Sequence, residues 1–213
     1  MYAASVKGRR LNFCVSEMLW QRSLVMKDVE TGSLWSHILG ESMRGELKGV
    51  KLEMLPSVMT SWDDWKSEHP DTTVLSLSRT ANRFDPEFQK SPGKFVLGVG
   101  GLGEKLAFAF EDLAAGKVIN DVLGEKELVV TFDPKTTEAH CFTRRVEGKL
   151  LVFESLDEAG RMRDRGTGSV WLTESGTCLS GALKGKALEE IPAMVSFRRA
   201  WFAFHPDSRE FGK

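Results

Sequence analysis

The chain has 213 residues, 41 % of them hydrophobic, and a formal net charge of −1 at pH 7. These values are typical of a globular protein and exclude a broadly basic nucleic-acid-binding protein, so we expect no nucleic-acid partner. No apolar run reaches the ~18–20 residues of a membrane span, and the first residues contain no apolar export signal. We therefore expect no membrane span. The cytoplasm is the default location, although the composition does not establish it.

The first part of the chain is expected to form short strands and one helix. The pattern predicts strands at 9–15, 24–28, 33–38, 50–55 and 74–77. The second and third of these form a hairpin around a glycine turn at 30–32. A helix is predicted at 60–69, because Thr60 or Ser61 can cap it and two acidic residues follow.

The second part is expected to contain more strands and another helix. Apolar residues alternate between glycine and Asp-Pro turns, which predicts strands at 95–99, 105–110, 117–122, 127–132 and 149–155. A helix at 196–205, capped by Ser196, is apolar nearly all round. We expect this helix to be buried between the two parts, and Trp201 to be more buried than Trp65 on the other helix. The predicted fold class is α+β, mostly antiparallel β.

Two segments of the chain repeat each other. Residues 26–72 align with 162–208 at a constant offset of 136, and 18 of the 47 aligned positions are identical. Further upstream the offset is 140, with Phe13 matching Phe153. We therefore expect a tandem duplication, each copy with one short helix. The first half (1–90) and the second half (91–213) are expected to pack as one globular unit.

The halves differ in what precedes the repeated part. The predicted strands over 95–132 come before it in the second half, whereas its first matching residue in the first half, Val6, lies almost at the start of the sequence. We expect the first half to lack these leading strands. An uncovered strand edge invites pairing, so self-association through this edge is possible.

The first half also has four extra residues between Phe13 and Met26. Connections carry function more often than the elements that they join, and this one holds an additional tryptophan. We expect a ligand site here, lined by polar and aromatic residues that the second half does not share. The candidate residues are Ser16, Trp20, Arg22, His37 and Glu41. The alternative is that they are exposed residues on a hairpin.

Three other motifs favour a structural interpretation. Residues 98–103 fit GxGxxG, but the apolar alternation that follows favours a glycine-rich hairpin over a dinucleotide site, which needs a helix beginning at Glu104. The His-Pro-Asp runs at 69–71 and 205–207 are expected to end helices rather than to supply a general acid or base. His140 and Cys141 offer two metal ligands, which is too few for a site, so no metal is expected. The cysteines, Cys14, Cys141 and Cys178, are too scattered for a disulfide framework.

Several runs resemble a known family. They are Gly-Arg-Arg-Leu-Asn-Phe at 8–13, Asp-Val-Glu-Thr-Gly-Ser-Leu-Trp-Ser at 28–36, Gly-Glu at 40–41, His-Pro-Asp-Thr at 69–72 and Arg-Ala-Trp-Phe-Ala-Phe-His-Pro-Asp at 199–207. Over nearly the whole chain the sequence resembles the microbial domain-of-unknown-function family 3179. The resemblance implies no activity and no catalytic residues. Longer members carry Cys-Pro-Leu-Cys just before the first Gly-Arg-x-Leu-x-Phe strand, and we expect this chain to lack that segment.

Two functional hypotheses follow. The first is a binding or accessory domain that holds a small molecule or a protein partner near residues 15–23. The second is an enzyme, redox or metal-assisted, whose N-terminal cysteine segment is missing from this chain. The sequence identifies neither the cofactor nor the substrate.

Overall fold

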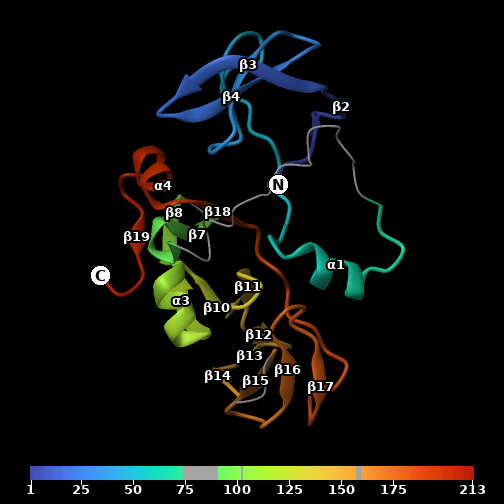
Figure 1. The fold of residues 1–213 in the computed structure, drawn as a ribbon. Helices are drawn as coiled ribbons and strands as arrows, with labels where there is room; N and C mark the ends of the chain where they lie inside the picture. The colour runs from blue at the N-terminus through green and yellow to red at the C-terminus, as the bar shows by residue number, and fades with distance from the viewer. Residues whose placement is uncertain (74–90, 102, 157–159) are drawn as a thin grey trace.

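The computed structural model describes residues 1–73, 91–101, 103–156 and 160–213. Over these ranges the protein is a mostly antiparallel α+β fold with three short helices, which confirms the predicted fold class. Figure 1 shows one four-stranded sheet at the top of the molecule, a second at the bottom, and further sheets between them. No helix in the described ranges is long and apolar enough to cross a membrane.

The first half forms a small hairpin, a four-stranded sheet and one helix. The hairpin consists of β1 (Ser5–Val6) and β2 (Arg9–Arg10). The antiparallel sheet has the order β3 (Phe13–Trp20), β4 (Ser23–Asp28), β5 (Leu34–Ser36) and β6 (Glu41–Arg44). The helix α1 (Trp62–Glu68) follows and buries no residue.

The middle of the chain forms two sheets that enclose the largest core. After η1 (Pro92–Lys94), the first sheet contains β7 (Phe95–Gly101) and β8 (Glu104–Ala109), flanked by β18 (Ala193–Phe197) and β19 (Arg209–Glu210). The second sheet contains β9 (Val118–Leu123), β10 (Lys126–Asp133) and β11 (Glu138–Thr143), with β10 in the centre. The helix α3 (Phe110–Gly116) joins the two sheets, and its Phe110 and Leu113 belong to the core.

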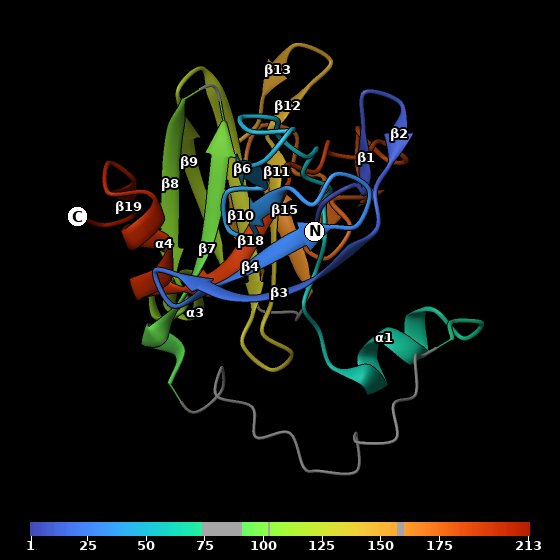
Figure 2. The same ribbon diagram turned by 90° about the horizontal axis from the view of Figure 1, so that it is seen from above.

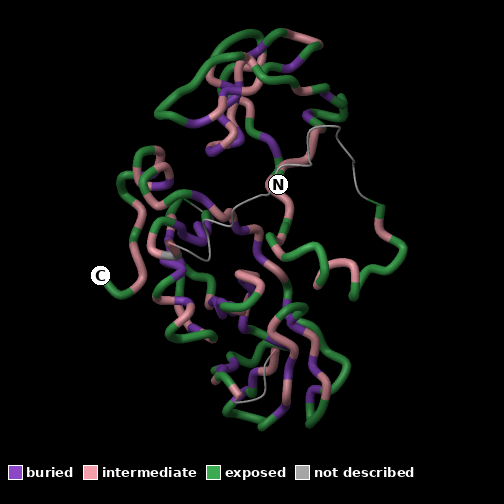
Figure 3. Tube along the Cα trace, in the orientation of Figure 1, coloured by how far each residue is buried: buried purple, intermediate pink, exposed green. Residues whose placement is uncertain are grey.

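The second half then repeats the order of elements found in the first. The hairpin consists of β12 (Arg145–Val146) and β13 (Lys149–Leu150). The sheet has the order β14 (Phe153–Ser155), β15 (Arg161–Asp164), β16 (Val170–Leu172) and β17 (Cys178–Ser180). The helix α4 (Arg198–Phe204) comes after β18. Figure 3 shows buried residues in both four-stranded sheets and in the central ones.

One set of hydrogen bonds holds the central turn of each four-stranded sheet. Asp28 accepts from the backbone N–H and the hydroxyl of Thr31 and, at 2.8 Å, from Nε1 of Trp35. Both Asp28 and Trp35 are completely buried, so the carboxylate satisfies an indole N–H that would otherwise lack a partner. The second half has the same arrangement, formed by Asp164, Thr167 and Trp171.

A second shared contact involves glycines with positive φ. A Cβ on Gly40 would lie 2.3 Å from the ring of Tyr2, and one on Gly176 would lie 3.1 Å from the ring of Phe142. Tyr2 forms an isolated bridge with Met54, and residues 142 and 190 form the matching bridge in the second half. In both halves an aromatic ring therefore covers the turn that precedes the last strand of the sheet.

The hairpin interpretation of residues 98–103 is confirmed. β7 and β8 pair from Val96 with Ala109 to Gly101 with Glu104, so Glu104 begins a strand rather than a helix. Gly98 lies beneath the ring of Trp201, since a Cβ there would be 2.2 Å from Cζ3. The glycine provides space for a tryptophan of α4.

Three local predictions were wrong and one cannot be assessed. The strand predicted at 50–55 is replaced by two isolated bridges, at Lys51 and Met54, because its backbone pairs with two different segments. Ser196 does not cap α4, because it lies in β18, where it pairs with Val96; the N-cap is Phe197 and the helix begins at Arg198. The helix α3 was not predicted between two expected strands. The strand at 74–77 falls outside the described residues.

The two compared helices differ in burial as predicted. Trp201 on α4 is 3 % exposed, whereas no residue of α1 is buried, so Trp201 is more buried than Trp65. The expectation that α4 is buried on several faces was wrong, because Trp201 is its one buried residue. The Phe204 ring meets Trp20 edge-on, with centroids 4.8 Å apart, and Figure 2 shows the tip of the β3–β4 hairpin reaching α4.

Candidate functional site

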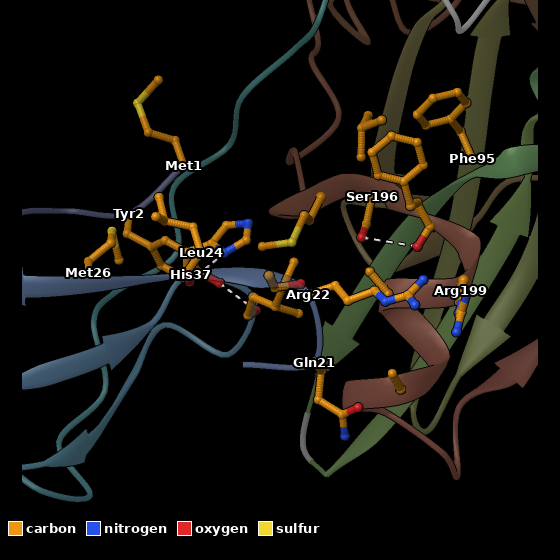
Figure 4. A pocket seen from close by; sticks show the side chains of 17 residues that line it. Met1, Tyr2, Gln21, Arg22, Leu24, Met26, His37, Phe95, Ser196 and Arg199 are labelled. Carbon is orange, nitrogen blue, oxygen red and sulfur yellow. Dashed lines mark hydrogen bonds between the residues drawn. The ribbon is translucent and has the colours of Figure 1, made fainter. Parts of the chain in front are cut away.

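A cavity of about 980 Å³ lies between the first-half sheet and the β18–α4 segment. One wall comes from the β3–β4 turn, β4 and the turn after β5, together with the first two residues of the chain. The opposite wall comes from the start of β7, from β18 and from α4 (Figure 4). The cavity therefore forms where the two halves meet.

Most of the lining is apolar. The apolar residues are Met1, Tyr2, Leu24, Met26, Ile38, Phe95, Met194, Val195, Phe197, Ala200 and Ala203. Three of them are methionines, whose flexible thioether side chains adapt to ligands of different shape. An apolar cavity with a few polar groups is the usual form of a small-molecule site.

The polar part of the lining is positively charged. Arg22 enters from the β3–β4 turn and Arg199 from α4, and no aspartate or glutamate is among the described residues that line the cavity. In Figure 4 the Arg22 side chain extends from the hairpin in the direction of α4, which carries Arg199. Neither guanidinium has an ion pair or a hydrogen bond to another described residue. Both donors are therefore available to a ligand.

The hairpin turn holds Arg22 in a strained backbone conformation. Gln21 and Arg22 have φ values of 52° and 64°, a region that side-chain-bearing residues seldom adopt. This two-residue turn joins β3 to β4, and paired positive φ values match the twist of a tight hairpin. The turn therefore fixes where the Arg22 side chain leaves the backbone.

Tyr2 and His37 are held by backbone carbonyls at the first-half wall. The Tyr2 hydroxyl donates to the Ile38 carbonyl at 2.9 Å, and burial raises the pKa of Tyr2 to about 12. Nδ1 of His37 lies 3.0 Å from the Leu24 carbonyl, which can only accept, so Nδ1 carries the proton. In the neutral ring this leaves Nε2 as an acceptor.

The structure brings two of the five predicted site residues into the cavity. Arg22 and His37 line it, whereas Ser16, Trp20 and Glu41 do not. The Ser16 hydroxyl donates to the Val25 carbonyl at 2.6 Å, Trp20 packs on Phe204, and Glu41 pairs with Lys51 at 3.5 Å. These three residues therefore have structural partners elsewhere on the first-half sheet or on α4.

The sequence analysis missed the second-half wall. The wall includes Arg199, Met194 and Phe197, which have no identical counterpart 136 positions earlier. The comparison of the halves looked for residues specific to the first half, near the insertion, and therefore did not select them. One feature of the sequence could have indicated this wall: the helix predicted at 196–205 is apolar nearly all round. Its extra apolar side chains, which we assigned to a buried interface, face the cavity at Ala200 and Ala203.

The His-Pro-Asp runs end helices, as predicted. The backbone N–H groups of His69 and His205 close the last turns of α1 and α4 on Trp65 and Trp201. Each imidazole packs against the same tryptophan, with ring centroids 4.0 and 4.3 Å apart. Burial lowers the pKa of His205 to about 4, with a smaller effect from Lys105.

The cysteines lie on separate elements. Cys14 is exposed on β3, whereas Cys141 and Cys178 are buried on β11 and β17. Cys141 belongs to the central core, and burial raises its pKa far above the usual range. His140 precedes it on the strand and therefore points to the opposite face of the sheet. Among the described residues, no three His, Cys, Asp or Glu side chains are placed to hold a metal ion.

Comparison with known families gives a match over almost the entire chain. The family described as "Protein of unknown function (DUF3179)" matches residues 1–94 and again residues 88–208. Comparisons with curated proteins and with solved structures give no match. The resemblance seen in the sequence is confirmed.

Proposed function

This chain belongs to the DUF3179 family of proteins of unknown function, and we propose from its own residues that it is a small-molecule-binding domain. The proposed ligand is an amphiphile with an apolar body and one anionic group, such as a carboxylate. The site is the cavity between the first-half sheet and the β18–α4 segment, next to the extended β3–β4 hairpin.

The observation that carries this proposal is the charge of the cavity. Arg22 and Arg199 bring two guanidinium groups to an otherwise apolar lining, and no lining carboxylate among the described residues neutralises them. A guanidinium forms paired hydrogen bonds with a carboxylate, and these are strengthened where apolar walls exclude water. A cationic or an uncharged ligand would not neutralise the positive charge of the two guanidinium groups.

The size of the cavity supports a small molecule. Small-molecule sites usually occupy about 300–1,000 Å³, and this cavity of about 980 Å³ lies near the upper limit. Met26 on β4 and Met194 on β18 belong to opposite walls of that lining. They can close on an acyl chain or on a compact ring system.

We further propose that the halves, 1–90 and 91–213, arose by tandem duplication. The shared sheet order, the Asp–Thr–Trp turns and the two matches to one family support this. In the second half the turn after β16 is covered, because Thr131 on β10 donates to the Thr173 carbonyl at 2.7 Å. The matching turn in the first half, at His37, faces the cavity instead. The turn after β16 is thus covered by the β9–β11 sheet, whereas the matching turn after β5 borders the cavity.

The remaining predictions stay predictions. Ser16, Trp20 and Glu41 remain candidates for a surface that binds a protein partner, since β3 is an edge strand with Val15 and Leu19 more than half exposed. Self-association through this edge remains a prediction as well. The redox or metal-assisted enzyme gains no support from the described residues.

Isothermal calorimetry tests the proposed function. Dodecanoate, below its micellar concentration, is titrated into the wild-type chain and into the variants Arg22→Gln and Arg199→Gln. A charge-assisted hydrogen bond contributes about 1.5–3 kcal/mol, so we expect each substitution to weaken binding by at least about tenfold.

Two controls separate charge recognition from general apolar binding. Arg163 is exposed on β15, away from the cavity, and Arg163→Gln should bind like the wild type. Dodecanol has the same chain without the anionic group and should bind more weakly than dodecanoate. Equal binding of both ligands, or equal binding by all three arginine variants, would refute the proposal.

A further inference from the structure

A second, smaller hollow is lined by residues other than those of the cavity described above. It measures about 30 Å³ and sits between the outer face of β10 and β11 and the turn that follows β16. The residues that line it are Thr131, Phe132, Asp133, Glu138, His140, Gly160, Thr173 and Glu174. None of them lines the large cavity, so the two sites are separate.

His140 contributes a buried nitrogen without a partner. Its side chain is 10 % exposed, and Nδ1 lies 3.1 Å from the Glu190 carboxylate, which accepts the Nδ1 proton. Nε2 is buried and has no hydrogen-bond partner. Buried polar atoms are nearly always paired. With the proton on Nδ1, Nε2 of the neutral ring is an acceptor, and it has no donor among the described residues.

The surroundings of Nε2 are acidic. Glu138 and Glu174 line the hollow, and the negative charge of Glu68, at the end of α1, raises the pKa of both. Burial is the largest cause that raises the pKa of both lining carboxyls and the charge of Glu68 adds to it, whereas His140 lowers the pKa of both. A bound cation would relieve the repulsion between these groups.

Thr60 supplies one donor to Glu138. Its Oγ1 is buried, and a hydrogen bond from its hydroxyl lowers the pKa of the Glu138 carboxyl. Of the buried side-chain atoms that lack a partner in the described residues, His140 Nε2 is the one that lines the hollow.

We propose that this hollow binds one cationic nitrogen, either an ammonium ion or the amino group of a small primary amine. His140 Nε2 and the carboxylates of Glu138 and Glu174 accept its N–H groups. The volume of about 30 Å³ is large enough for one group of the size of a water molecule, such as an ammonium.

The spacing of the groups favours an ammonium over a metal ion. Ligand atoms lie about 2.0–2.2 Å from a bound zinc ion, so three of them must converge closely, and no three of the described side chains do. Hydrogen bonds from a charged nitrogen span about 2.7–2.9 Å and tolerate a wider arrangement. Acceptors and negative charge therefore fit a nitrogen cation better than they fit a metal.

Nuclear magnetic resonance of the histidines tests this proposal. The full chain, labelled with ¹⁵N at histidine, is titrated with methylammonium chloride or ammonium chloride, while sodium chloride keeps the ionic strength constant. We expect a saturable shift of the His140 Nε2 signal, with no matching change at His37, His69 or His205. The salt that saturates at the lower concentration identifies the source of the nitrogen.

Matched ligands and variants make the result specific. Tetramethylammonium has the same charge but no N–H group and should leave His140 unchanged. Glu174→Gln, at the open edge of the hollow, should weaken the response at least about tenfold, while Glu125→Gln in the exposed β9–β10 turn should not alter it.

Four results would overturn the proposal, three of them in the amine titrations. They are the absence of any saturable shift, an equal response to tetramethylammonium, and a His140 ring that carries both protons before any amine is added, because then Nε2 is a donor. A response to zinc or manganese without a response to either ammonium salt would also overturn it and would indicate a metal site.

Discussion

At the scale of single residues, two buried aspartates hold the turns of the two outer sheets. Asp28 receives three hydrogen bonds from Thr31 and Trp35, although it is completely buried. A buried carboxylate is stable only where donors compensate for the loss of water. The Asp–x–x–Thr–Gly–Ser–x–Trp run, present in both halves, supplies these donors from within eight residues of sequence.

We predict that Asp28→Asn destabilises the protein by about 1–3 kcal/mol, because the amide nitrogen of asparagine would face N–H donors. Urea unfolding measures the loss. Glu46→Gln, in an exposed turn of the same sheet, should change stability by less than about 0.5 kcal/mol. Equal stability of the two variants would show that the turn does not depend on the carboxylate.

The same variant should alter the pH dependence of stability. Burial alone would raise the pKa of Asp28, but the hydrogen bonds from Trp35 and Thr31 outweigh it, and the pKa lies below its usual value. A lowered pKa contributes stability that is complete above the unfolded-state value and is lost as the pH falls through the folded-state value. Below about pH 4 the wild type should therefore lose stability more steeply than Asp28→Asn.

Individual site residues could be predicted only in part. Arg22 and His37 stood out because they differ between the halves, and both line the cavity. Arg199 could not be found in this way, since it lies on the half that we treated as the reference. Trp20 was selected for its side chain, but it packs on Phe204, a contact 184 residues away that no local pattern reveals.

At the scale of elements, alternation and turn residues predicted most strands, while long-range pairing decided the rest. The strands over 95–132 were recognisable because Gly and Asp-Pro separate them. Residues 50–55 alternate like a strand, yet their backbone bridges to Glu41 at one point and to Tyr2 at another. The split between two partners depends on the tertiary fold, so the sequence pattern of that segment alone could not show it.

The packing of α4 on β7 can be tested at two glycines of the same strand. A Cβ on Gly98 would lie 2.2 Å from the Trp201 ring, whereas a Cβ on Gly100 would meet nothing within 4 Å. We predict that Gly98→Ala destabilises the protein by about 1–3 kcal/mol, because the ring must move within a packed site. Thermal unfolding of both variants measures the difference.

Gly100→Ala is the matched control and should lie within about 0.5 kcal/mol of the wild type. Similar losses in both variants would mean that β7 disfavours any side chain, and that α4 does not rest on Gly98. This comparison also distinguishes the structural use of the glycines from a nucleotide-binding loop, in which Gly100 should matter as much as Gly98.

At the scale of the whole molecule, the account rests on a difference between two similar halves. In the second half, a three-stranded sheet covers the turn after β16, and Thr131 is hydrogen-bonded to it. In the first half, the matching turn faces a cavity whose other wall is β18 and α4. The result is an apolar space with two arginines, which we propose to be the ligand site.

Methyl resonances of methionine test this central claim most directly. The chain contains eight methionines, of which Met26 and Met194 line opposite walls of the cavity, whereas Met162 is completely buried in the second-half core. With ¹³C-labelled methionine methyl groups and dodecanoate as ligand, we predict saturable shifts of Met26 and Met194 and none of Met162. Saturable binding that leaves Met26 and Met194 unchanged, or no binding at all, would contradict the account.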